Sequence, residues 1–174
     1  MSDKTSHGGL VHNVHDAGKA KVPKITHKID NDLIYPMIRG RDISRWKCTP
    51  KYHVLVVQDP VKKIGINETF MKTKKPSTYS FLLKFKKILK NRKSRSAKMT
   101  FAKGGAFYSM YDVIPDSFSE IKVVWRRMGK KFRAAVIGTL DFGSEKRCIL
   151  PIDNVCFIPI SNEEEAHYIC ALLN

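Results

Sequence analysis

The chain has 174 residues, of which 43% are hydrophobic, and this length and composition predict one folded domain and exclude an intrinsically disordered segment. Its 32 Lys and Arg residues against 16 Asp and Glu give a formal net charge of +16, which is typical of a protein that binds a polyanion. The sequence lacks an apolar run of about 18 residues and an apolar signal core, so we expect no membrane span and a cytoplasmic protein.

The first segment predicts a leader followed by a pair of strands. We expect residues 1–9 to form a loose leader and residues 10–174 to form the folded domain. Residues 10–15 and 20–27 flank Asp16-Ala17-Gly18, a turn signal between two β-forming runs. This pattern predicts an antiparallel hairpin.

Residues 32–46, DLIYPMIRGRDISRW, predict a sharp corner in the chain. Pro36 excludes a continuous helix, and Gly40 permits a tight backbone turn. We expect the Trp46 side chain to lie in the core. The next run, YHVLVVQ at residues 52–58, is rich in β-branched and apolar residues and predicts a buried strand.

Residues 77–93 form the clearest predicted helix. Pro76 precedes it, and Ser77 or Thr78 can cap it. The apolar residues at helical spacing are Phe81, Leu82, Phe85, Ile88 and Leu89. Six of the other positions are basic and none is acidic, which is unusual for a helix that needs only to be soluble.

The rest of the chain predicts short strands and a closing helix. The predicted strands cover residues 118–127, 132–137, 147–150 and 155–160, and Met128-Gly129-Lys130-Lys131 forms the turn between the first two. Trp125 is expected in the core. Residues 161–173 predict a helix that begins with a Ser161-x-x-Glu164 capping box and reaches Asn174 without a stop signal, so we expect the domain to be truncated there. Together these elements predict an α+β fold, a twisted and mostly antiparallel sheet with two or three packed helices.

Two long blocks of the sequence contain bases and no acids. Residues 69–111 carry twelve Lys or Arg residues, and residues 121–140 carry six. Blocks of one sign favour a nucleic-acid surface over an ordinary solvated face, because a surface that needs only solubility normally mixes both signs.

Residues 114–122, IPDSFSEIK, carry the letters of a magnesium nuclease site, PD…ExK. In such a site Asp116 and Glu120 would hold the metal and Lys122 would orient a water molecule. On an extended chain their spacing separates the two acids by about 13 Å. Each acid would have to bring an oxygen to about 2.1 Å from one magnesium ion. We therefore expect Glu120 to be a solvent-facing strand residue.

Four segments, in this order, resemble the TaqI-like C-terminal specificity (target-recognition) domain of type II and type IIG adenine-N6 DNA methyltransferases. They are residues 32–46 (DLIYPMIRGRDISRW), 76–92 (PSTYSFLLKFKKILKNR), 106–127 (AFYSMYDVIPDSFSEIKVVWRR) and 164–174 (EEAHYICALLN). Any one of them is a weak signal, whereas four in the family's order are a strong one. The chain has no Pro-Pro dipeptide and no Gly-rich turn of the kind that the catalytic half of these enzymes carries.

The resemblance implies a module that recognises double-stranded DNA, with a methyltransferase catalytic domain in cis. S-adenosylmethionine is the cofactor that it implies for the parent enzyme, with Mg²⁺ if the parent also cleaves DNA. We expect no catalytic residue, metal ligand or cofactor in this chain itself. The residues that we expect to contact DNA are Arg39, Arg41 and Arg45 in the corner, Lys84, Lys87 and Lys90 on the helix, and Lys122, Arg126, Arg127, Lys130 and Lys131 along the hairpin.

Alternatives remain open at this level. Arg41 and Asp42 could pair with each other and brace the corner instead of contacting DNA. The whole chain could be a stand-alone magnesium-dependent nuclease that uses Asp116, Glu120 and Lys122. It could also be a basic RNA-binding protein.

Overall fold

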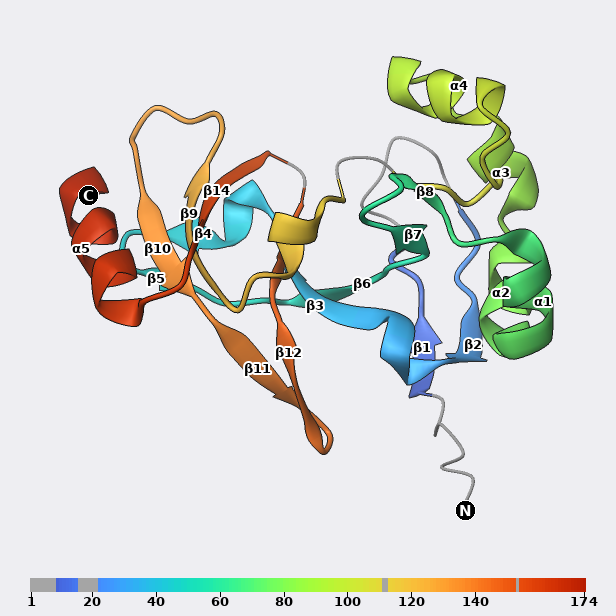
Figure 1. Ribbon diagram of the computed structural model, residues 1–174, viewed down its shortest axis with the longest axis horizontal. Helices are drawn as coiled ribbons and strands as arrows, with labels where there is room; N and C mark the ends of the chain where they lie inside the picture. Colours follow the sequence, from blue (N-terminus) through green and yellow to red (C-terminus); the bar gives the residue numbers. More distant parts are fainter. Residues whose placement is uncertain (1–8, 16–21, 111–112, 153) are drawn as a thin grey trace. The chain divides into compact units, whose positions relative to one another are not determined.

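The computed structural model describes residues 9–15, 22–110, 113–152 and 154–174 (Figure 1). The chain divides into two compact units, each built from two separate stretches. Unit 1 contains Met1–Leu33 and Val57–Asp112, and unit 2 contains Ile34–Val56 and Val113–Asn174. The α+β class is confirmed, although the strands form several small sheets instead of one. Among the described residues, no helix is long and apolar enough to span a bilayer.

Unit 1 contains two small sheets. β1 (Gly9–His12) pairs with β2 (Thr26–Ile29) in antiparallel register, which confirms that two strands pair here. The second strand begins later than predicted, because residues 22–25 of the predicted run over residues 20–27 are not in a strand. The predicted turn at Asp16-Ala17-Gly18 lies outside the described residues. The second sheet joins β7 (Gln58–Asp59) to β8 (Ile64–Gly65).

The described part of unit 1 also contains a short 3-10 helix and four α-helices. They are η1 (Asn31–Leu33), α1 (Glu68–Lys74), α2 (Pro76–Leu83), α3 (Lys86–Lys90) and α4 (Arg95–Ala102). The single helix predicted over residues 77–93 is wrong, because a break at Lys84 and Phe85 separates α2 from α3. Lysines of like charge recur here at spacings of three and four residues, and such pairs destabilise a continuous helix.

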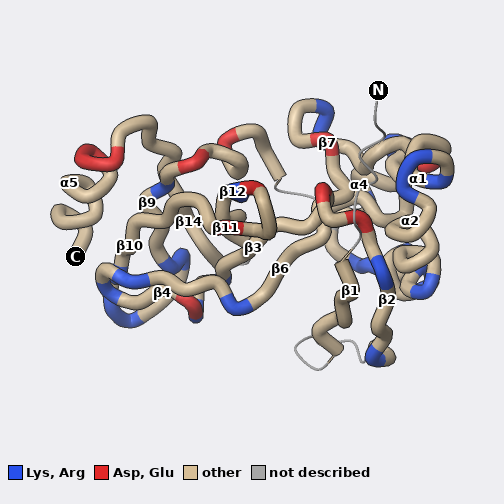
Figure 2. The backbone as a smooth tube through the Cα atoms, turned by 90° about the horizontal axis from the view of Figure 1, so that it is seen from below, with Lys and Arg blue, Asp and Glu red and all other residues tan. Residues whose placement is uncertain are grey.

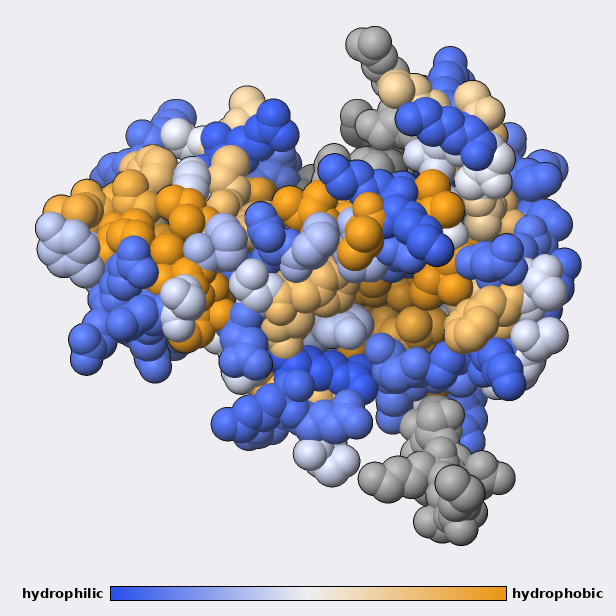
Figure 3. Space-filling view, viewed as in Figure 1, coloured by the Kyte–Doolittle hydropathy of each residue, from blue (hydrophilic) through white to orange (hydrophobic). Residues whose placement is uncertain are grey.

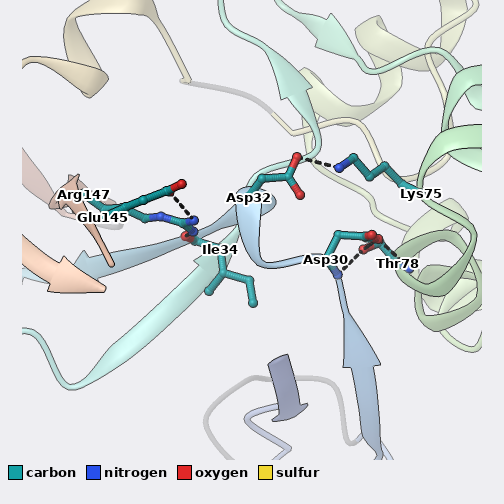
Figure 4. Close-up of polar contacts among 7 residues, drawn as sticks. All are labelled: Asp30, Asp32, Ile34, Lys75, Thr78, Glu145 and Arg147. Atoms are coloured by element: carbon teal, nitrogen blue, oxygen red, sulfur yellow. Dashed lines mark hydrogen bonds and ion pairs between the residues drawn. The ribbon is translucent and has the colours of Figure 1, made fainter. Parts of the chain in front are cut away.

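Asp30 caps α2 from a distant part of the chain (Figure 4). The Thr78 hydroxyl donates to Asp30 Oδ2 at 2.6 Å, and the Thr78 backbone N–H donates to the same oxygen at 3.4 Å. In return the Asp30 backbone N–H donates to Thr78 Oγ1 at 3.0 Å. The predicted cap by Ser77 or Thr78 is therefore wrong: Lys75 occupies the capping position and has no capping side chain. Lys75 instead forms an ion pair with Asp32 at 2.7 Å.

Aromatic side chains form the centre of unit 1. Tyr79 of α2 meets the rings of Phe107 and Tyr108 edge-on, with ring centroids 6.3 and 6.5 Å apart. All three side chains are buried. Edge-to-face contacts of this kind add to the stabilisation from burial alone, so they hold α2 against the segment that follows α4.

Unit 2 contains two three-stranded sheets. Their strands are β3 (Ile34–Ile38), β6 (Tyr52–Leu55) and β13 (Leu150–Pro151) in one, and β9 (Ile121–Arg126), β10 (Ala134–Ile137) and β14 (Val155–Ile160) in the other. β3 pairs with β6 antiparallel and with β13 parallel, whereas β9 pairs antiparallel with both neighbours. The predicted hairpin across the residue 128–131 turn is thus confirmed as β9 and β10. The strand predicted over residues 52–58 is shorter than expected, since β6 ends at Leu55.

The remaining elements of unit 2 are two short strand pairs and three helical segments. They are β4 (Ile43–Ser44) with β5 (Lys47–Cys48), β11 (Thr139–Phe142) with β12 (Glu145–Cys148), η2 (Gly40–Asp42), η3 (Pro115–Phe118) and α5 (Glu163–Leu173). Asn162, not the predicted Ser161, caps α5 by accepting hydrogen bonds from the backbone of Glu164 and Glu165.

β9 is buried on both faces, which makes it the central strand of unit 2. On one face Val123 packs against Ala166 and Cys170 of α5, with Trp125 half-buried beside them. On the other face Val124 belongs to a second apolar cluster with Ile38. Apolar side chains also reach the surface over and beside α5, as Figure 3 shows.

Arg147 fixes β12 to β3 from inside unit 2 (Figure 4). Its guanidinium donates to the carbonyl oxygen of Ile34 and to Glu145 Oε2, the latter at 3.2 Å. It also lies over the Phe142 ring, 4.3 Å from the ring centroid. A buried cation with these three partners holds the β11–β12 hairpin against the sheet.

Candidate nucleic-acid interface

The structure brings the predicted corner next to the β9–β10 hairpin in unit 2. Gly40 of η2 is buried, and a Cβ atom at this position would lie 3.2 Å from Cγ of Arg126 and 3.0 Å from the carbonyl oxygen of Asn154. The backbone N–H of Trp46 donates to the carbonyl oxygen of Ala134 at 2.9 Å. The Asn154 carbonyl and the Arg126 side chain thus leave little room for a side chain at position 40.

Six of the basic side chains that are exposed on this part of unit 2 define what we call the corner–hairpin surface. They are Arg41, Arg45, Arg126, Arg127, Lys130 and Lys131. None of them forms an ion pair with a residue that the structure describes. Figure 2 shows the basic segments of unit 2 gathered around β4 and β10. Cations without acidic partners produce a positive field that attracts a polyanion.

Arg39 has a different role from its two neighbours in the corner. Its guanidinium forms an ion pair with Asp42 at 3.3 Å and lies over the Tyr52 ring, 4.2 Å from the centroid. Its side chain is only 11% exposed. The partner of Asp42 is thus Arg39, whereas Arg41 is exposed. The corner is braced from the inside by Arg39, which leaves Arg41 available to solvent.

Lys122 is not on the surface. The residue is 0% exposed, and its ammonium group donates to the carbonyl oxygens of Ser119 and Ile149. Desolvation by burial lowers the pKa of Lys122 to about 8. The prediction that Lys122 contacts DNA is wrong, because its side chain points into unit 2 and not toward solvent.

The burial of Lys122 also keeps its ammonium group away from the two acids of the nuclease motif. Asp116 lies in η3 with an exposed side chain, and Glu120 is exposed just before β9. Lys122 is enclosed, so its ammonium group cannot orient a water molecule between the two acids. No group of three or more His, Cys, Asp or Glu side chains that could hold a metal ion occurs in the described parts of the chain.

The predicted helical lysines belong to unit 1. Lys84 directly follows α2 and its Nζ lies 3.3 Å from Nδ1 of His27. Lys87 and Lys90 are exposed on α3. These three side chains belong to unit 1, whereas the corner–hairpin surface belongs to unit 2.

Two exposed aromatic residues beside the arginines were missed. Trp46, expected in the core, is 54% exposed and its backbone has a φ of 66°. Arg45 lies over its ring, 5.9 Å from the centroid. Phe132 is also exposed and packs against Trp125 with ring centroids 6.1 Å apart. The only signal in the sequence for the exposure of these two side chains was that aromatic residues stand among Arg and Lys in turn segments.

Comparisons with known proteins show a similarity to part of a type II methyltransferase. No family model matches the sequence. The chain is 31% identical over 148 residues to the type II methyltransferase M.NspV of Nostoc sp.. The match covers 84% of this chain, whereas the chain spans only 28% of that methyltransferase. The similarity therefore relates this chain to a part of a type II methyltransferase.

Proposed function

We propose that this chain is the target-recognition module of an adenine-N6 DNA methyltransferase from a restriction–modification system, and that it binds double-stranded DNA through the corner–hairpin surface. The observation that carries the proposal is the set of six exposed cations that the corner and the β9–β10 hairpin bring together, none of them in an ion pair with a described residue. Arg45 of this set donates a hydrogen bond to the carbonyl oxygen of Asn174. The similarity to part of a type II methyltransferase supports the same function.

The shape of the surface suits a DNA groove. A two-stranded β-ribbon fits the major groove, which is about 12 Å wide. In this arrangement the turn residues Lys130 and Lys131 contact phosphates and set the register of the protein on the duplex. Arg126 and Arg127 lie where the hairpin leaves the sheet, and an arginine fork can donate two hydrogen bonds to a guanine edge.

Catalysis belongs to another part of the parent protein in this proposal. Most of the matched methyltransferase lies outside the aligned region. The catalytic domain, in cis, would bind S-adenosylmethionine and receive the flipped adenine, while this module selects the site. A fused endonuclease activity would add a requirement for Mg²⁺ in the parent enzyme.

Salt dependence tests the electrostatic part of the proposal. Fluorescence anisotropy with the purified chain and a labelled duplex measures affinity between 50 and 300 mM salt, values chosen around the physiological range. If about six phosphates are contacted, log affinity falls against log salt with a slope of about −5. An affinity that does not change with salt contradicts the proposal.

Selection from a random duplex library tests sequence recognition. We expect a short consensus to be enriched, and an unchanged base distribution contradicts recognition of a target. RNA that outcompetes duplex DNA at equal salt supports an RNA-binding protein instead. Magnesium-dependent cleavage that is lost in Glu120→Ala supports a nuclease instead.

A further inference from the structure

Unit 1 contains a cavity of about 580 Å³ that the corner–hairpin surface does not include. Its walls come from the β7–β8 region, the start of α1, α3 and the segment that follows α4. Cavities that bind small molecules usually have volumes of about 300 to 1,000 Å³. The cavity thus has room for a ligand larger than a single inorganic anion.

Four lysines line this cavity and give it a positive charge. They are Lys62, Lys86, Lys90 and Lys103. Within the described residues none of the four has an acid within 4 Å. Lys86 lies over the Phe107 ring, 5.3 Å from its centroid, which places its ammonium group against the wall of the cavity.

The two acids in the lining, Asp59 and Glu68, have other partners. Asp59 Oδ1 accepts the backbone N–H groups of Val61 and Lys62, both at 2.9 Å. Glu68 accepts a hydrogen bond from the Tyr79 hydroxyl at 2.5 Å and forms an ion pair with Lys72 at 3.3 Å. Four lysines against two acids leave the lining with a net charge of +2.

The frame of the cavity is fixed by close packing around Ser109. The Gly65 backbone N–H donates to Ser109 Oγ at 3.1 Å, and the serine is 2% exposed. A Cβ atom at Gly65 would lie 2.5 Å from that oxygen, and one at Gly105 would lie 2.6 Å from Cγ2 of Thr100. Gly104 has a φ of 76°, a conformation that glycine adopts without strain. The lining is therefore held in shape without a ligand.

We propose that this cavity binds one nucleotide, with its phosphate group among the four lysines and its base against the apolar part of the lining. Ile64, Ile66 and Phe107 provide that apolar part. A phosphate accepts charge-assisted hydrogen bonds from several ammonium groups at once. The nucleotide is either free or a residue of a nucleic-acid strand. Binding of a nucleotide within a nucleic-acid strand rests on the proposed function, whereas binding of a free nucleotide does not.

Binding of a nucleoside 5′-monophosphate, followed by titration calorimetry and by backbone amide NMR shifts, tests the cavity. We expect the monophosphate to bind, and the unphosphorylated nucleoside to bind at least about tenfold more weakly, because the phosphate contacts are lost. Lys86→Gln/Lys103→Gln and Lys62→Gln/Lys90→Gln should each weaken binding about tenfold. Lys74→Gln/Lys98→Gln removes the same charge from exposed positions of unit 1 outside the cavity and should bind as the wild type does.

Equal losses in the cavity variants and in the control variant overturn the proposal, because they indicate a general charge effect. Equal binding of the nucleoside and its monophosphate also overturns it. Competition by a single-stranded tetranucleotide indicates binding of a nucleotide within a strand, and its failure to compete indicates binding of a free nucleotide. Arg127→Gln separates the two proposals, because it should weaken duplex binding at the corner–hairpin surface and leave mononucleotide binding to the cavity unchanged.

Discussion

The ammonium group of Lys122 donates a hydrogen bond to the carbonyl oxygen of Ile149, 3.1 Å away, in the interior of unit 2. A second bond to the carbonyl oxygen of Ser119 holds the same group. The lysine therefore joins β9 to the residue that precedes β13, and two carbonyl oxygens depend on it.

This buried lysine should make the stability of unit 2 depend on pH. Burial lowers the pKa of Lys122 from 10.5 to about 8, so between these values the folded state has lost a proton that the unfolded state still holds. Stability rises with pH wherever the unfolded state binds more protons. We expect the free energy of unfolding to rise by an amount on the order of 2 kcal/mol between pH 8 and 10.5, relative to Lys122→Met.

Urea denaturation of both proteins at several pH values measures this difference. The other titrating groups are common to both proteins, so they cancel in the comparison. Parallel curves for the wild type and Lys122→Met would show that the ammonium group is not buried.

Removing one arginine from the corner–hairpin surface should weaken binding to all duplexes. Arg127 is exposed and unpaired within the described residues, so Arg127→Gln should reduce the slope of log affinity against log salt by about 1. Lys146→Gln is the control, since Lys146 is also exposed but lies on the β11–β12 hairpin, which extends away from the β9–β10 turn in Figure 1. Equal changes of the salt slope in the two variants would indicate that the DNA does not bind at the corner–hairpin surface.

Gly40→Ala should displace Arg126. The new Cβ atom would lie 3.2 Å from Cγ of Arg126 and 3.0 Å from the carbonyl oxygen of Asn154, so one neighbour must move. We expect a loss of stability of about 1 kcal/mol and weaker DNA binding. A Cβ atom at Gly138 would meet no heavy atom within 4 Å, so Gly138→Ala should affect DNA binding little. Urea denaturation and fluorescence anisotropy of both variants provide the measurement.

Arg147→Met should loosen the β11–β12 hairpin. It removes the donor to the carbonyl oxygen of Ile34 and leaves that buried oxygen without this hydrogen bond. A lost buried hydrogen bond of this kind costs about 1–3 kcal/mol. Glu145→Gln should cost less than about 1 kcal/mol, because the Glu145 side chain is mostly exposed and surface ion pairs contribute little. Urea denaturation, together with hydrogen exchange of the β11–β12 amides, distinguishes the two variants. Equal losses of unfolding free energy in Arg147→Met and Glu145→Gln would contradict the role of Arg147.

Periodicity and turn chemistry predicted the elements that local sequence determines. The β9–β10 hairpin follows from two apolar runs around a Gly-Lys-Lys turn, and it was confirmed, although the connection is longer than the expected residues 128–131 because β9 ends at Arg126 and β10 begins at Ala134. The helix over residues 77–93 was predicted as one piece because its apolar stripe is continuous. The break at Lys84 and Phe85 was missed because the apolar stripe was given more weight than the repulsion among the lysines.

The exposure of individual side chains was harder to predict. Lys122 and Arg126 have the same sign and lie four residues apart on β9, yet one is enclosed and the other exposed. The difference depends on Ile149, a residue 27 positions away from Lys122 that supplies the acceptor. Trp46 was expected in the core, yet its side chain is exposed. The division into two units depends on contacts between distant segments and has no local signal.

Each unit is built from two separate stretches of the chain, and this affects how the chain folds during synthesis. Unit 1 has all of its residues once position 112 has been made, whereas β3 and β6 wait for β13 at Leu150–Pro151. Contacts between such distant residues form slowly, because a long loop must close first. Until β13 arrives, one edge of the β3–β6 pair has unpaired backbone groups, and an open strand edge is a template for aggregation. A nascent chain that stalls between these points would therefore carry a folded unit 1 beside an unprotected strand edge.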